Sequence, residues 1–265
     1  GIAEIVIKNG PAGVSIRSLS KEYVQDDKHV LAVSNVNLEI ADGEFVCVVG
    51  HSGCGKTTLL NILAGFLEPT SGTVVFGDGT AARDGDIGVV FQEYALFPWR
   101  TALGNVEFGL EMRNVPPAER RKKAQQFLEL VHLGNAAGTY PHQLSGGMRQ
   151  RVAVARALAY DPALLLMDEP FGALDAQTRE RLQSLTEEIW QKTRKTVFYV
   201  THNLGEAVYL ADRIVVMRPN PGRVHQVIPV DLPRPRDPLS AEFVALQRQI
   251  TDLIKDDREV DDDRA

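Results

Sequence analysis

The feature that most constrains this chain is the segment GHSGCGKT at 50–57, which stands between the apolar run 45–49 and the helix-like segment 58–65. Glycines let the backbone curl so that consecutive N–H groups point at one anion, and a helix that follows adds its positive end. A strand before this pattern and a helix after it distinguish a phosphate-binding loop from a chance match. The segment therefore predicts phosphate binding, in preference to a glycine-rich turn with a stray lysine.

Within this loop, Lys56 is expected to bridge the outer phosphates as a point charge, and the Thr57 hydroxyl to ligate Mg²⁺. Cys54 has two interpretations, which the sequence leaves open. The helix start and Lys56 form an electropositive setting that favours the thiolate, but a small buried residue is an equal alternative. The remaining predicted nucleotide contacts of the loop are Gly50, Ser52, Gly53, Cys54, Gly55 and Thr58.

A second motif is the apolar run 164–167, which is followed by Asp168 and Glu169. A strand of this kind delivers both carboxylates to the end of a sheet at which nucleotides bind. Asp168 is expected to hold the Mg²⁺ shell, and Glu169 to activate water as a general base. The alternative, a surface turn, is weaker because such an apolar strand normally ends in the core.

The most specific string is LSGGMRQR at 144–151. Ser145 is a good helix N-cap, and Gly146 and Gly147 expose backbone N–H groups at the start of the following helix. Alone, such a start is more often only a cap. Together with 50–57 and the two carboxylates, it predicts a second anion-binding helix start.

The rest of the chain predicts an α/β fold. Hydrophobic residues make up 44% of 265 residues, enough for one large core with an inserted subdomain. Apolar patterns predict strands at 14–23, 33–40, 45–49, 73–76, 87–91, 164–167, 196–200, 214–217 and 223–229, and helices at 58–65, 102–112, 117–133, 146–159, 176–192 and 241–254. The charged tail 256–265 is expected to be disordered.

Composition excludes several classes of protein. The formal net charge of -6 argues against a protein whose main task is binding nucleic acid. The basic run 120–123 lies in a helix-like segment and is expected to be a solvated face. The apolar start of the chain is broken by Glu4 and Lys8 and is not expected to be a signal peptide, and no run reaches the roughly 20 apolar residues of a membrane span. Two cysteines without zinc spacing indicate a reducing compartment.

With these motifs in this order, residues 14–223 resemble the nucleotide-binding subunit of ATP-binding cassette (ABC) transporters. The resemblance implies a P-loop NTPase core with a RecA-like mixed sheet, an antiparallel β subdomain and an inserted α-helical subdomain. The implied division is 1–93 for the β subdomain and first half of the core, 94–160 for the helical subdomain, 161–230 for the second half of the core, and 231–265 for the C-terminal helix and tail.

The resemblance also implies roles for further residues. Tyr23 resembles the aromatic residue that stacks on adenine, and Gln92 resembles the lid glutamine that touches Mg²⁺ and senses the membrane partner. Asp175 belongs to a segment, 173–175, that resembles the D-loop. His202 resembles the switch histidine that contacts the γ-phosphate. The implied cofactors are therefore ATP and Mg²⁺.

In this family two subunits pack head to tail, so that Ser145 and Gly147 of one close over the nucleotide held by 50–57 of the other. The implied partners are a second copy of the chain or a similar ATPase subunit, membrane permease subunits and, indirectly, an extracytoplasmic solute-binding protein, with no nucleic acid. The implied location is peripheral, at the cytoplasmic face of the inner (plasma) membrane.

The aromatic stretch 91–99 is expected to receive a short coupling helix of the permease, and Phe97 and Trp99 suit an apolar socket. Together with the segment 218–223, the stretch looks most like importers of nitrate, sulfonate, taurine and related anions. Importers of polyamines, sugars or other small solutes are the closest alternatives. A soluble ABC-type ATPase acting on a nucleic acid or protein complex is the alternative from a different class.

Overall fold

The computed structural model describes residues 13–25, 28–77 and 86–262, and the side chains of 25 and 256–262 are not described. The chain divides into two compact units, one built from 86–195 and the other from 13–77 with 196–262. The expectation for the start of the chain, around Glu4 and Lys8, and the last three residues of the predicted tail lie outside the described residues.

The unit of 13–77 and 196–262 contains an antiparallel sheet of β1 (Val14–Gln25), β2 (Lys28–Ile40) and β4 (Ser71–Phe76), in the order β2-β1-β4. In the second half of β2, buried and solvent-facing positions alternate, as predicted for a strand with one wet face. The two strands run further than predicted, because Tyr23 pairs with Val30 and Gln25 with Lys28. Residues 24–25 and 28–32, which lie outside the predicted strand ranges, thus belong to β1 and β2.

The same unit contains a parallel group in which β3 (Phe45–Val49) pairs with β7 (Thr196–Val200) on one side and β8 (Arg213–Arg218) on the other. β9 (Arg223–Pro229) adds an antiparallel strand to β8. All five residues of β3 are buried, as expected of a parallel strand covered on both faces. The helices of this unit are α1 (Lys56–Leu63), α6 (Leu204–Leu210) and α7 (Ala241–Asp262).

The helix α7 corrects one expectation, since it continues to Asp262 where a disordered tail was predicted from residue 256 onward. Residues Phe243 and Ile250 are buried, and α7 packs against α6 and β8. Once these contacts have formed the first turns, each further residue adds a hydrogen bond at little cost. The composition of the tail does not reveal that it is helical, because the cause lies in the anchored helix that precedes it.

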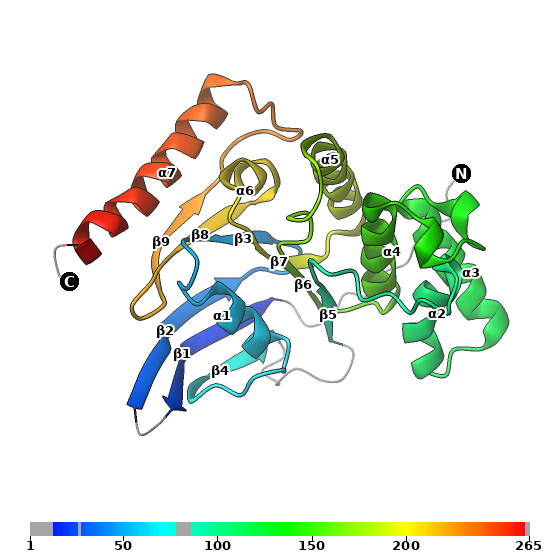
Figure 1. The fold of residues 1–265 in the computed structure, drawn as a ribbon, viewed down its shortest axis with the longest axis horizontal. Coiled ribbons are helices and arrows are strands. Elements are labelled where there is room, and N and C mark those ends of the chain that lie inside the picture. Colours follow the sequence, from blue (N-terminus) through cyan, green and yellow to red (C-terminus); the bar gives the residue numbers. More distant parts are fainter. Residues whose placement is uncertain (1–12, 26–27, 78–85, 263–265) are drawn as a thin grey trace. The chain divides into compact units, whose positions relative to one another are not determined.

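The unit of 86–195 contains the parallel pair β5 (Ile87–Val90) and β6 (Leu164–Asp168). Its helices are α2 (Ala102–Met112), α3 (Pro117–Leu130), α4 (Gly146–Ala159) and α5 (Ala176–Thr193), with short 3₁₀ turns at Gly134–Ala136 and Pro141–Gln143. The helices α2, α3 and α4 pack on one another, as predicted for a helical insertion (Figure 1).

Three residues of the basic run in α3, Arg121, Lys122 and Lys123, are exposed, as predicted, whereas Arg120 is half-buried. Lys123 pairs with Glu119 one turn away at 2.8 Å. Across the described ranges, no helix is both long enough and apolar enough to span a bilayer. The division at 93, 160 and 230 stays a prediction.

Candidate functional site

The segment 50–57 joins the buried strand β3 to α1, as predicted. Gly55 caps the helix with a φ of 88°, a conformation that favours glycine. A Cβ at Gly55 would lie 2.9 Å from a methyl group of Val33, and one at Gly50 would lie 2.7 Å from the Met217 carbonyl oxygen. The loop therefore needs glycine both for its curl and for its close packing against β2 and β8.

Lys56 is buried at the start of α1. Its ammonium group donates hydrogen bonds to the carbonyl oxygens of Gly50 and, at 3.2 Å, of His51. The loop also has open space beside Gly53, where an added Cβ would meet nothing within 4 Å. A buried cation next to such a space has the chemistry that an anionic phosphate requires. Thr57 is exposed, and Thr58 is half-buried.

Cys54 is the loop residue for which the sequence left two interpretations open. Burial raises the pKa of its thiol, although Lys56 acts in the opposite direction. Cys54 is therefore a buried thiol and not a stabilised thiolate. Of the two interpretations that the sequence allowed, the structure supports the small buried residue.

His202 is exposed just after β7 and before α6, as its predicted role requires. It lines one cavity of about 600 Å³ together with Gly50, His51 and Ser52 of the loop. The other two lining residues are Leu204 at the start of α6 and Ile254 of α7. His51, which stands at a variable position of the loop pattern, was not among the predicted site residues.

In the other unit, the Ser145 hydroxyl caps α4 and accepts a hydrogen bond from the Met148 N–H at 3.2 Å, as predicted. Asp175 caps α5 in the same way and accepts hydrogen bonds from the Thr178 N–H and hydroxyl. The Thr178 hydroxyl lowers the pKa of the Asp175 carboxyl group below its ordinary value. A Cβ at Gly147 would lie 2.8 Å from the Thr178 methyl group, so the two helix starts lie side by side.

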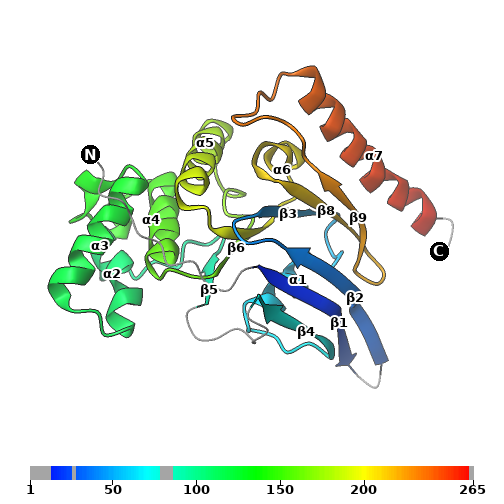
Figure 2. The same cartoon turned by 180° about the vertical axis from the view of Figure 1, so that it is seen from behind.

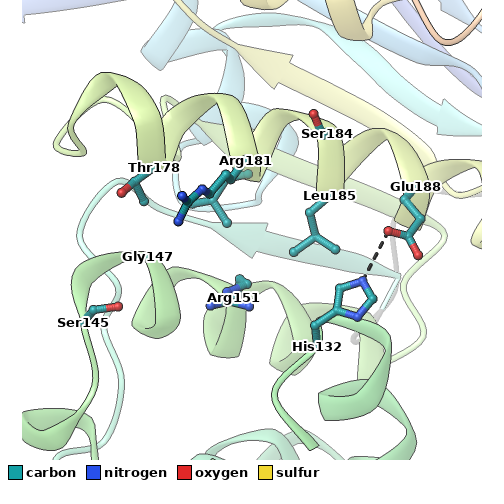
Figure 3. Close-up of a pocket in the computed structure, with 10 residues that line it drawn as sticks. His132, Ser145, Gly147, Arg151, Thr178, Arg181, Ser184, Leu185 and Glu188 are labelled. Carbon is teal, nitrogen blue, oxygen red and sulfur yellow. Dashed lines mark hydrogen bonds and ion pairs between the residues drawn. The ribbon is translucent and has the colours of Figure 1, made fainter.

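These helix starts open into a pocket of about 480 Å³ that continues between α4 and α5 (Figure 3). Arg151 and Arg181 lie across it from one another, and His132 contacts Glu188 at its far end at 3.2 Å. Burial lowers the pKa of the Arg151 guanidinium group. The face that carries Ser145 and Gly147 is thus accessible and carries positive charge.

Asp168 is the last residue of β6, and Glu169 follows it, as predicted. Glu169 has a φ of 42°, in the left-handed region that a non-glycine residue rarely adopts. Both side chains are half-buried. Backbone strain of this kind is concentrated at functional sites, where the surrounding structure maintains it.

Gln92 follows β5, and its side-chain amide lies beside Gly172, where a Cβ would be 3.0 Å from Nε2. One residue that the sequence reasoning missed connects this region to α4. The buried Gln150 donates hydrogen bonds to the carbonyl oxygens of Phe91 at 3.3 Å and Pro170 at 2.6 Å. Its presence in the string 144–151 was the only signal that sequence offered.

Tyr23 lies exposed on β1, and Lys21 Nζ is 5.3 Å from the centre of its ring. Adenine stacking on Tyr23 stays a prediction. In the described part of the chain, no group of three or more acidic, histidine or cysteine side chains gathers as a metal cluster. The predicted Mg²⁺ ligands are instead one hydroxyl, one amide and one carboxylate, from Thr57, Gln92 and Asp168, a set of oxygen donors that suits Mg²⁺ when phosphates supply the rest.

A phosphate loop after a buried parallel strand, a strand that ends in two carboxylates and a capped Ser-Gly-Gly helix start define an ATP-binding cassette within the P-loop NTPases. The ABC transporter family model matches residues 33–172. An uncharacterised ABC transporter ATP-binding protein of Methanocaldococcus jannaschii is 50% identical over 245 residues, which are 92% of each chain. The chain belongs to the ABC transporter family and is an ABC-type ATPase.

Two relatives have more specific names. The nitrate import ATP-binding protein NrtD of Synechocystis is 46% identical over 221 residues, 83% of each chain. The taurine import ATP-binding protein TauB of Roseobacter denitrificans is 47% identical over 216 residues, 81% of each chain. Among solved structures, a dimeric post-hydrolysis state of the cassette MJ0796 with ADP and Pi matches with a TM-score of 0.72 and 37% identity, over 83% of this chain and 99% of that one.

Proposed function

We propose that this chain is the ATP-hydrolysing subunit of an importer that takes up a small anion, of the nitrate, sulfonate or taurine kind, through a separate permease. The observation that carries the proposal is the similarity to nitrate and taurine import subunits over four fifths of the chain. An aromatic cluster that follows Gln92 in the chain and includes the exposed Trp99 supports it, because an importer subunit needs a surface for its membrane partner.

In the ATPase part of this proposal, the loop amides and Lys56 hold the phosphates of ATP, and the Thr57 hydroxyl and Asp168 hold Mg²⁺. The metal ion supplies charge neutralisation of the phosphate oxygens. Glu169 accepts a proton from the attacking water, and His202 contacts the terminal phosphate from the cavity that it lines together with 50–52. Tyr23 stacks on adenine.

Two copies complete each site in this proposal. Ser145 and Gly147 face an open, positively charged pocket in a single chain, so a phosphate held by a partner's loop has access to them. Asp175, at the start of α5 beside this pocket, belongs to the same contact surface. The dimeric, nucleotide-bound state of the similar cassette supports this arrangement.

The permease docks on the aromatic cluster of Phe97, Trp99 and Phe108. Phe97 lies 5.5 Å from the Trp99 ring and 4.7 Å from the Phe108 ring, measured between centroids. Trp99 is 70% exposed, although tryptophan normally buries its large apolar surface. Arg156 donates to the Ala95 carbonyl oxygen at 2.9 Å and so fixes the segment between Gln92 and the cluster. An apolar face of a short helix suits this surface.

The docking test uses two exposed apolar residues as a matched pair. Trp99→Ala should leave the ATPase rate of the isolated chain unchanged and should reduce co-purification with the permease at least tenfold. Leu239→Ala is the control, because Leu239 is 90% exposed and lies just before α7, outside the cluster. Undiminished permease binding by Trp99→Ala would remove the docking assignment.

The class of function is tested by what stimulates hydrolysis. With the permease in vesicles, addition of an anion-loaded solute-binding protein should raise the ATPase rate several-fold. Stimulation by DNA, RNA or ribosomes without any membrane partner would instead indicate a soluble ABC-type ATPase. Stimulation by a solute-binding protein loaded with a polyamine or a sugar would leave the proposed ATPase role intact and would change the proposed class of transported solute. A peripheral position at the cytoplasmic face of the membrane follows from the same proposal.

A further inference from the structure

His51 contacts two parts of the site at once. Its Nε2 lies 2.8 Å from the backbone carbonyl oxygen of Ile254 in α7. Because a carbonyl oxygen can only accept, Nε2 carries the proton in this hydrogen bond. The carbonyl oxygen of His51 accepts a hydrogen bond from Lys56 at 3.2 Å. His51 therefore connects α7 to the lysine on which phosphate binding depends.

The α7 side of this connection is firmly held. Phe243 and Ile250 are buried, and α7 lies alongside α6 in both views of the fold (Figures 1 and 2). Ile254 follows Ile250 by one helical turn, so its carbonyl oxygen lies next to an anchored residue. The acceptor of the His51 hydrogen bond is thus supported by the hydrophobic core.

The loop side of this connection is rich in glycine. Gly53 and Gly55 adopt φ values of 79° and 88°, and glycine loses more conformational freedom than any other residue when it is ordered. Within this segment, the Cys54 N–H donates a backbone hydrogen bond to the His51 carbonyl oxygen at 3.2 Å. A side-chain hydrogen bond to a fixed helix holds such a loop in one conformation before the nucleotide binds, and so lowers the entropy cost of binding.

We propose that His51 is a positioning residue, and that its hydrogen bond to α7 holds the phosphate loop in the shape that presents Lys56 and the loop amides to the nucleotide. The cavity of about 600 Å³ that Gly50, His51, Ser52 and His202 share with Ile254 places α7 at the wall of the ATP site. The α7 helix therefore influences nucleotide affinity through its hydrogen bond with His51. The proposal rests on the assignment of 50–57 to the phosphates of ATP.

The first test measures ADP binding by the full chain with isothermal titration calorimetry. His51→Ala should raise the Kd about fivefold, which corresponds to about 1 kcal/mol at 1.4 kcal/mol per tenfold. His51→Gln should restore the Kd to within about twofold, because its amide can donate to the same oxygen. In steady-state hydrolysis, His51→Ala should raise the KM for ATP and leave kcat unchanged, since the hydrogen bond acts on binding and not on Glu169.

The second test removes the acceptor. A chain ending at residue 253 should show the same loss as His51→Ala, whereas a matched chain ending at residue 255 should bind ADP like the full chain, because it keeps the Ile254 carbonyl group. Combining His51→Ala with the chain ending at 253 should cause no further loss of ADP affinity, since both changes remove the same hydrogen bond. A cooperative thermal transition confirms that each variant folds, and if the chain ending at 253 does not fold, the comparison of Ala with Gln decides.

Three results would overturn the proposal. They are an ADP affinity of His51→Ala within twofold of the unaltered chain, no recovery with His51→Gln, and losses that add in the combined variant. Lys56→Ala separates this inference from the assignment on which it rests. It should weaken ADP binding more than tenfold, and normal binding by Lys56→Ala would mean that 50–57 does not hold the phosphates. The absence of a permease partner would not affect these measurements, because they use the chain alone.

Discussion

Gln150 offers the sharpest test of how the site is held together. It lies on α4 with no exposed surface, and its side-chain amide donates to the carbonyl oxygens of Pro170 at 2.6 Å and Phe91 at 3.3 Å. These two acceptors follow the strands β6 and β5, close to Glu169 and Gln92. We predict that Gln150→Leu lowers the stability of the unit of 86–195 and loosens both segments.

The magnitude follows from these contacts. Each hydrogen bond contributes about 1 kcal/mol, and a buried acceptor left without a donor costs about 1 to 3 kcal/mol. Against this, Gln150 Oε1 is itself buried without a hydrogen-bond partner among the described residues, so its removal offsets part of the loss. The net destabilisation should be about 2 kcal/mol, or roughly 4 to 8 °C in Tm.

Urea unfolding followed by tryptophan fluorescence is the appropriate assay. The chain has 2 tryptophans, Trp99 and Trp190, and both belong to the unit that contains Gln150. The midpoint should fall while the slope of the transition stays constant. Gln177→Ala, at an exposed position on α5, is the control and should change stability by less than about 0.5 kcal/mol. An equally small effect of Gln150→Leu would refute the role assigned to its two hydrogen bonds.

Three further predictions concern other parts of the chain. Arg236 is buried and donates to backbone carbonyl oxygens at the end of α6 and after β9. Because Arg236→Met leaves these buried acceptors without a donor, it should cost about 3 kcal/mol or more in a urea titration, and a change below about 1 kcal/mol would contradict this. Glu169→Gln should retain ATP and form a stable dimer in size exclusion with light scattering, and a monomer under saturating ATP would count against the composite site. Burial raises the pKa of Cys54, so the thiol is protonated at pH 7. Maleimide should therefore label it slowly until urea unfolds the chain, whereas fast labelling of the folded chain at pH 7 would show that the thiol is accessible and ionised.

Much of this protein follows from short stretches of sequence. The residues 45–57 predict a buried strand, a phosphate loop and a helix, and the structure contains these elements. Ser145 was expected to cap a helix and does so through its hydroxyl group. Such features are predictable because their causes are local: hydrophobic periodicity, glycine dihedrals and caps act within a few residues.

Other features depended on distant contacts. Charge favoured a thiolate at Cys54, but burial raises the pKa of that thiol, and burial is a property of the packed chain. Composition favoured a disordered tail, but α7 continues to Asp262 from a segment that is anchored in the core. In both cases a local tendency was outweighed by tertiary packing.

The sequence alone determined the class of the protein, because the segments 50–57, 144–151 and 164–169 are contiguous patterns. The expected roles of Tyr23, Gln92 and His202 came from the resemblance to the family. Only the tertiary structure revealed Gln150 as the link between two strand ends, and His51 as the link between the phosphate loop and α7. His51 and Ile254 are 203 residues apart, and a hydrogen bond across that separation has no sequence pattern, since it exists only after the chain has folded.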